Sequence, residues 1–206
     1  MSKKRRRDNG TTGRTKTTPD GEHYIQIPAD GDCGFACFCT AGATELDVRG
    51  LRARVAESLT EDHFSALQAA FAADPRGYSY MRRCRSLHDL RTLTRPTGSE
   101  VGSRMCVWAD WTHLQLMANI TKVTCLMRDQ TSGLCLVIKP EDAAPAESES
   151  ESESRSSSSC AASLSSSYLH ILRVNNVHFN LFAISDKRIF SREELEGTSL
   201  ASRFDL

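Results

Sequence analysis

The feature of this sequence that most limits its fold is a Ser/Glu-rich tract at residues 140–167, which interrupts a chain otherwise patterned with apolar residues. The tract alternates Ser with Glu, continues as consecutive Ser, and holds almost nothing that could enter a core. Such a segment buries too little apolar surface to offset the entropy of ordering its backbone. We therefore expect a long solvated, disordered insertion within a single domain.

The 206 residues suit one domain, because two domains of half this length would each have a marginal core. Residues 1–21 are polar, and their cationic cluster from Lys3 to Arg7 predicts a disordered basic arm. We expect the folded domain at residues 22–186 and a C-terminal tail at 187–206. The formal net charge of zero conceals the contrast between this basic arm and an acidic run at residues 141–153.

Several locations and partners are disfavoured by composition. No apolar run approaches the ~20 residues of a membrane span, and the charged start is unlike a secretory signal. We therefore expect a protein of the cytoplasm or nucleus. In that reducing environment the eight cysteines are expected to be thiols. Lys3 to Arg7 would suit a nuclear import receptor. Sequence-specific nucleic-acid binding is not expected, because aromatic or helical readers are missing.

Hydrophobic periodicity predicts helices in the first part of the chain and strands in the last. A helix is expected from Cys33 to about Gly42, others over 46–71, and one over 108–119 with Asp110 as its N-cap. Strands are expected at 122–127, 134–138, 168–174 and 177–184, with Asn175 and Asn176 in a hairpin turn. The predicted fold class is α+β, with helices packed on a mostly antiparallel sheet.

Cys33 is the candidate nucleophile. A thiol attacks only when ionised, and a helix N-terminus together with a neighbouring histidine can lower its pKa. Asp30, Gly31 and Asp32 form a turn signal directly before Cys33. Such a turn can direct backbone N–H groups at one point beside the sulfur, which is how an oxyanion hole is built.

The general base must come from a distant part of the chain. In the strand at 177–184, alternation places His178 and Asn180 on one face and Val177, Phe179 and Leu181 on the other. Asn180 can then orient the imidazole of His178. As alternatives, His178 is an ordinary strand residue, or Cys33 binds zinc with Cys37, Cys39 and His23, although that spacing is not typical of a zinc site.

Three motifs resemble those of ovarian-tumour (OTU) cysteine proteases. Residues 30–35 (DGDCGF) resemble their nucleophile motif, 177–180 (VHFN) their terminal histidine motif, and 108–110 (WAD), followed by Leu114 and Leu116, their central tryptophan helix. The motifs occur in the family's order, and the resemblance extends over about residues 24–184. In its compact domain with polar tails, this sequence also resembles virus-encoded members of the family.

The resemblance implies a papain-like fold and isopeptide hydrolysis through a thioester. Its expected partners are ubiquitin, polyubiquitin and ubiquitinated proteins, with no cofactor and no metal. It further implies a substrate channel near Trp108, Trp111 and Asn176. Two alternatives stay open: a catalytically silent ubiquitin-binding or adaptor module, and a papain-like protease with another substrate.

Overall fold

The computed structural model describes residues 21–141, 167–175, 177–196 and 198–204. The predicted basic arm, except Gly21, and most of the predicted Ser/Glu insertion lie outside these residues, as does Asn176. Among the helices of the described segments, none is long and apolar enough to span a bilayer.

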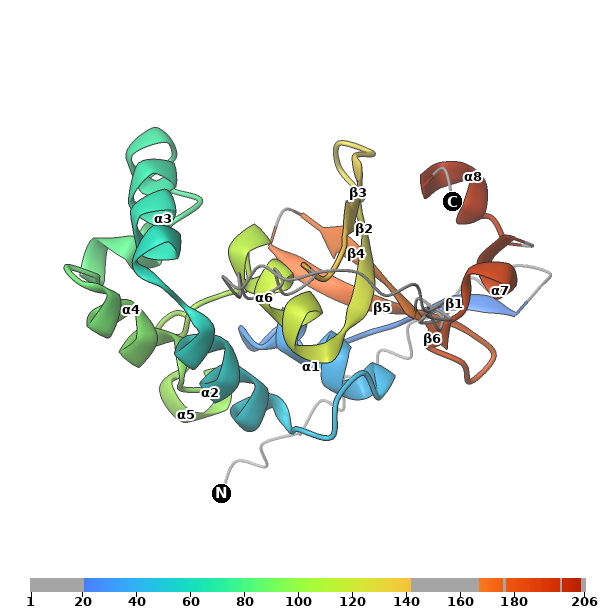
Figure 1. The fold of residues 1–206 in the computed structure, drawn as a ribbon, viewed down its shortest axis with the longest axis horizontal. Helices are drawn as coiled ribbons and strands as arrows, with labels where there is room; N and C mark the ends of the chain where they lie inside the picture. Colours follow the sequence, from blue (N-terminus) through green and yellow to red (C-terminus); the bar gives the residue numbers. More distant parts are fainter. Residues whose placement is uncertain (1–20, 142–166, 176, 197, 205–206) are drawn as a thin grey trace, which may run out of the picture.

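One mixed sheet forms the centre of the fold, with strand order β1-β5-β4-β2-β3 and with β6 also paired to β4 (Figure 1). Only β2 and β4 pair in parallel among the described strands, and the other pairs are antiparallel. The predicted α+β class with a mostly antiparallel sheet is therefore confirmed. The strands are β1 (Glu22–Ile25), β2 (Val123–Asp129), β3 (Cys135–Ile138), β4 (Ser167–Val174), β5 (His178–Ile184) and β6 (Ile189–Phe190).

Several helices, although not α1, begin at a residue whose side chain accepts one of the first free N–H groups. Asp47, Thr60, Ser86 and Asp110 each cap a helix in this way, and the cap predicted at Asp110 is confirmed. The α-helices are α1 (Cys33–Ala41), α2 (Val48–Ser58), α3 (Glu61–Ala73), α4 (Leu87–Thr94), α5 (Gly98–Val101), α6 (Trp111–Thr121), α7 (Arg192–Glu196) and α8 (Ala201–Phe204), with a 3₁₀ helix η1 (Ser79–Arg83).

Two apolar clusters cover opposite faces of the sheet, as strand alternation requires. Phe179 and Leu181 of β5 belong to the larger cluster, which α1 and α6 complete. Phe182 of the same strand belongs to a smaller cluster with residues from α7 and α8. In Figure 1, α2 to α5 gather at the side of α1 and α6 away from α7 and α8.

The folded region extends beyond the boundary expected at residue 186. Residues expected as a tail instead form β6, α7 and α8, and Phe190, Leu195, Leu200 and Phe204 are buried. These apolar residues are widely spaced in a polar sequence, so no regular period marks the segment. These hydrophobic residues form a cluster because they pack together against apolar side chains on the second face of the sheet.

His170 lies in this smaller cluster and makes the fold sensitive to acid. Its ring is fully buried among Tyr24, Phe182 and Phe204, and neither ring nitrogen has a hydrogen-bond partner among the described residues. Burial, with a smaller contribution from two nearby arginines, lowers the pKa of His170 from 6.5 to about 3. Below about pH 6.5, His170 therefore binds a proton in the unfolded chain but stays neutral in the folded chain until the pH approaches 3.

We expect the free energy of unfolding to fall as pH drops from 6.5 towards 3 (the unfolded and folded pKa values of His170), by up to about 1.4 kcal/mol per pH unit from this group. The contribution of His170 is complete above the unfolded pKa and is lost as pH falls. Urea unfolding of the wild type and of His170→Leu at about pH 7 and about pH 5 measures it. An equal loss in both proteins would contradict the assignment.

Candidate active site

Cys33 is the first residue of α1, as predicted. Its side chain is turned inward, leaving the residue 3% exposed. Its Sγ lies 4.0 Å from the carbonyl oxygen of Val177, the residue directly before β5. The candidate nucleophile and the histidine strand are therefore neighbours, although 144 positions separate Cys33 from Val177 in the sequence.

His178 and Asn180 are joined by a hydrogen bond of 3.0 Å between Nε2 of the ring and Oδ1 of the amide. Asn180 Oδ1 also accepts the backbone N–H of Ile27, at 3.2 Å. An oxygen cannot donate, so this arrangement assigns the proton to Nε2 and leaves Nδ1 with a lone pair. Nδ1 is buried and has no hydrogen-bond partner among the described residues.

The pKa of the Cys33 thiol differs from the sequence-based expectation. A helix N-terminus and a histidine were expected to lower it, but burial raises the pKa above the ordinary value of 9.0. The backbone N–H groups of Phe179 and Gly34 act in the opposite direction and offset part of this effect. A sulfur in this environment is mostly a thiol near neutral pH.

A buried arginine fixes the turn before Cys33. Arg52 of α2 has a fully buried guanidinium, whose Nε donates to Asp32 Oδ1 at 2.6 Å. Its other nitrogens donate to the carbonyl oxygens of Gly31 (2.9 Å), Val107 (2.9 Å) and Thr94 (3.0 Å). One side chain thus ties the nucleophile turn to two other segments.

The second oxygen of Asp32 accepts the backbone N–H of Gly98 at 2.8 Å. We call this network of Arg52 and Asp32 hydrogen bonds the clamp. The ring of Phe35 lies 4.2 Å below the guanidinium of Arg52. From the sequence, Arg52 is expected with Arg49 and Arg54 away from the apolar face of this helix, so its complete burial differs from that expectation. A signal was present, since Arg52 stands four residues after Val48 on a helix whose Leu51 and Val55 are buried.

Close packing explains the glycines of the turn. Gly31 has a positive φ of 97°, and a Cβ there would lie 2.3 Å from Cys106 Sγ. At Gly98 a Cβ would lie 1.8 Å from the carbonyl oxygen of Asp30. Neither position therefore has room for a side chain.

The expected oxyanion donors are not equally available. The backbone N–H of Asp32 donates to Asp30 Oδ1 at 3.0 Å, and is therefore occupied. The backbone N–H groups of Gly34 and Cys33 act to lower the pKa of the Cys33 thiol, against the larger effect of burial.

Of the expected channel residues, Trp108 and Trp111 line one cleft of about 1110 Å³, whereas Asn176 lies outside the described residues. The Nε1 of Trp108 donates to the carbonyl oxygen of Ser103 at 2.6 Å, which fixes the indole. Trp111 is 45% exposed. Val177, expected to face the core, also lines the cleft and is 52% exposed, because the strand begins only at His178.

The zinc grouping considered from the sequence is not assembled. His23 bonds the backbone of Gly21, and no group of three or more His, Cys, Asp or Glu side chains in the described segments is placed to hold a metal ion.

Neither the family models nor the curated proteins contain a match to this sequence. Among solved structures, an OTU domain in complex with ubiquitin is 12% identical, with a TM-score of 0.49 over 88% of this chain and 79% of that one. An OTU deubiquitinase from Wolbachia pipientis wMel is 15% identical, with a TM-score of 0.45 over 87% and 97%. The Hazara virus OTU bound to ubiquitin is 11% identical, with a TM-score of 0.39 over 79% and 81%. These are domains of the family whose motifs this sequence resembles.

Proposed function

We propose that this chain is a thiol-dependent deubiquitinase of the OTU type, which hydrolyses isopeptide bonds at the C-terminus of ubiquitin or a ubiquitin-like modifier. The observation that carries the proposal is the His178 ring, with Nε2 bonded to Asn180 and an unpartnered Nδ1, in a strand whose preceding carbonyl lies beside Cys33 Sγ. An orienting amide, a base and a thiol are the parts that a cysteine protease needs.

In the proposed mechanism, His178 Nδ1 takes the thiol proton as Cys33 Sγ attacks the isopeptide carbonyl. The N–H groups at the start of α1 stabilise the oxyanion, and the protonated histidine gives its proton to the leaving amine. Water, activated by the same Nδ1, then hydrolyses the thioester. The raised pKa of Cys33 favours this coupled proton transfer over a preformed thiolate.

The test is incubation of the wild-type protein with a ubiquitin bearing a C-terminal electrophile and with di-ubiquitins of each linkage. We expect one covalent adduct, located on Cys33 by peptide mass spectrometry, and cleavage of at least one linkage. Folded protein that forms no adduct and cleaves no linkage would overturn the proposal.

A second candidate is a silent ubiquitin-binding module, which the almost complete burial of Cys33 favours. Ubiquitin binding by titration calorimetry, without capture or cleavage in the same experiment, would select this candidate.

Substitution of the proposed base His178 should lower kcat/KM more than substitution of Asn180, which orients its ring. We expect His178→Gln to lower kcat/KM by roughly 10²–10⁴-fold, the range of general-base catalysis. Asn180→Ala should lower kcat/KM by a smaller factor. Asn180→Asp should lower kcat/KM less than Asn180→Ala does, because a carboxylate also accepts from Nε2. Initial rates on a fluorogenic ubiquitin substrate measure all three, and equal losses in the three variants would contradict these roles.

A further inference from the structure

A buried hydrogen-bonded cluster at the start of α6 has no part in the mechanism proposed above. Asp110 Oδ1 accepts the ring N–H of His113 Nδ1 at 2.7 Å and the backbone N–H of His113 at 3.2 Å. Asp110 Oδ2 accepts the hydroxyl of Tyr80 at 2.5 Å. His113 is fully buried and Tyr80 nearly so. One carboxylate therefore ties η1 to α6 through both of its oxygens.

Asp110 is held in its charged form within this cluster. Burial acts to raise its pKa, but the attraction of His113 and the hydrogen bonds from His113 and Tyr80 outweigh burial, so the pKa of Asp110 lies below the ordinary value of 3.8. Burial and the neighbouring carboxylate raise the pKa of Tyr80 above its ordinary value of 10.0, which keeps the hydroxyl proton on the ring. The hydrogen bonds of the cluster therefore persist at neutral pH.

The segment that Asp110 anchors packs against the two residues that follow the candidate nucleophile. Ala109 lies so close to Gly34 that a Cβ on Gly34 would be 2.5 Å from the Cβ of Ala109. The ring of His113 meets the ring of Phe35 edge to face, with the centroids 6.3 Å apart and an angle of 69° between the planes. The first turn of α1 therefore rests on residues on both sides of Asp110.

The clamp contacts the same part of α1 from α2. The guanidinium of Arg52 lies 4.2 Å from the centroid of the Phe35 ring, and it also donates to the carbonyl oxygen of Val107 in the segment before α6. The Nε2 atom of His113 is buried and has no hydrogen-bond partner in the described part of the chain. This end of the imidazole thus contributes packing and no proton transfer.

From these contacts we infer that Asp110 is a positioning residue for Cys33, because it holds Ala109 and His113 against the first turn of α1. The inference rests on the proposed function and adds a residue to that site. Asp110 acts through its neighbours and not on the substrate. A displacement of about 1 Å at a reacting atom can lower a rate by roughly 10²-fold, so a small movement of α1 is enough to matter.

Two variants weaken the cluster and keep the helix cap. Asp110→Asn retains a capping oxygen, but its amide nitrogen cannot accept the hydroxyl of Tyr80. Tyr80→Phe removes that hydroxyl alone. We expect Asp110→Asn to lower kcat on a fluorogenic ubiquitin substrate by roughly 10–10²-fold and Tyr80→Phe to lower it less, with little change in KM. The control is Tyr168→Phe, because Tyr168 is partly buried on β4 and is not a donor to Asp110.

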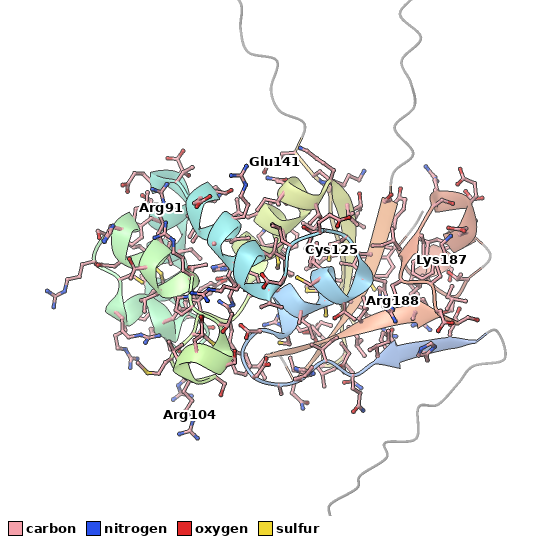
Figure 2. All side chains as sticks on the ribbon, turned by 90° about the horizontal axis from the view of Figure 1, so that it is seen from below. Arg91, Arg104, Cys125, Glu141, Lys187 and Arg188 are labelled. Atoms are coloured by element: carbon pink, nitrogen blue, oxygen red, sulfur yellow. The ribbon has the colours of Figure 1, made fainter. Side chains whose placement is uncertain are left out.

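The second readout needs no ubiquitin. Alkylation of Cys33 by iodoacetamide is followed against pH by peptide mass spectrometry, with Cys125 as the reference, because Cys125 is fully buried inside the fold (Figure 2). Burial raises the pKa of Cys33, and the backbone N–H groups of Phe179 and Gly34 offset part of that effect. Loss of support for Gly34 should therefore displace the Cys33 profile to higher pH in Asp110→Asn, while Cys125 stays unlabelled.

An unchanged kcat together with an unchanged Cys33 profile in Asp110→Asn would overturn the inference and leave the cluster with a role in stability alone. Faster labelling of Cys33 and Cys125 together would also overturn it, because the variant would then loosen the whole fold. A loss of kcat in Tyr168→Phe equal to that in Tyr80→Phe would do the same.

The two proposals fail separately. A displaced Cys33 profile in Asp110→Asn, in a chain that captures no ubiquitin, would overturn the proposed function alone. Ubiquitin cleavage by the wild type, with the same kcat and the same Cys33 profile in Asp110→Asn, would overturn the positioning role alone.

Discussion

Cys33→Ala is expected to abolish ubiquitin cleavage, with a loss on the order of 10⁶-fold, the size seen when a protease loses its nucleophile. The reason is that no other group near His178 Nδ1 is proposed to attack the carbonyl. The variant should remain folded, because it removes only one small atom from the core. Cleavage of di-ubiquitin over a wide range of enzyme concentrations measures the loss, and thermal unfolding checks the fold.

Cys39→Ala is the matched control for this variant. Cys39 lies on the same helix and is half-buried, but burial raises its pKa to about 11 and no role is proposed for it. It should retain wild-type activity. Similar losses in both cysteine variants would indicate damage to α1, and full activity in Cys33→Ala would reject Cys33 as the nucleophile.

Arg52→Met is expected to lower the free energy of unfolding by about 3–5 kcal/mol, the typical cost of breaking a buried ion pair. It leaves the Asp32 carboxylate buried without its cation and leaves the carbonyl oxygens of Gly31, Val107 and Thr94 without donors. Because the same contacts hold the nucleophile turn, kcat/KM should also fall at temperatures where the variant is folded. Urea unfolding and di-ubiquitin cleavage measure the two effects.

The comparison variants separate charge from geometry. Arg54→Met on the same helix should change stability by less than about 1 kcal/mol, because Arg54 is exposed and pairs with Glu57 only at the surface. Adding Asp32→Asn to Arg52→Met should recover part of the stability by removing the unpaired charge. Unchanged stability in Arg52→Met would show that the clamp contributes nothing to the fold.

Local features of the site were predictable from the sequence. The start of α1 at Cys33, the cap at Asp110 and the strand bearing His178 and Asn180 follow from turn residues, a capping side chain and the two-residue alternation of a strand. Each depends on interactions within a few residues. The sequence could also indicate that Cys33 and His178 belong together, but only through the order of motifs that resemble OTU domains.

Long-range packing decided the rest. Arg52 reaches acceptors up to 55 positions away, and residues of α7 and α8 pack in the cluster on the second face of the sheet. The cleft gathers arginines from segments far apart in the chain. Burial reversed the expected pKa shift of Cys33, because desolvation depends on neighbours that local sequence does not specify. The sequence by itself therefore determined which residues are candidates for the chemistry, through interactions within one turn or strand. Only the tertiary structure decided their environment, because desolvation, ion pairing and the shape of the cleft arise between segments far apart in the chain.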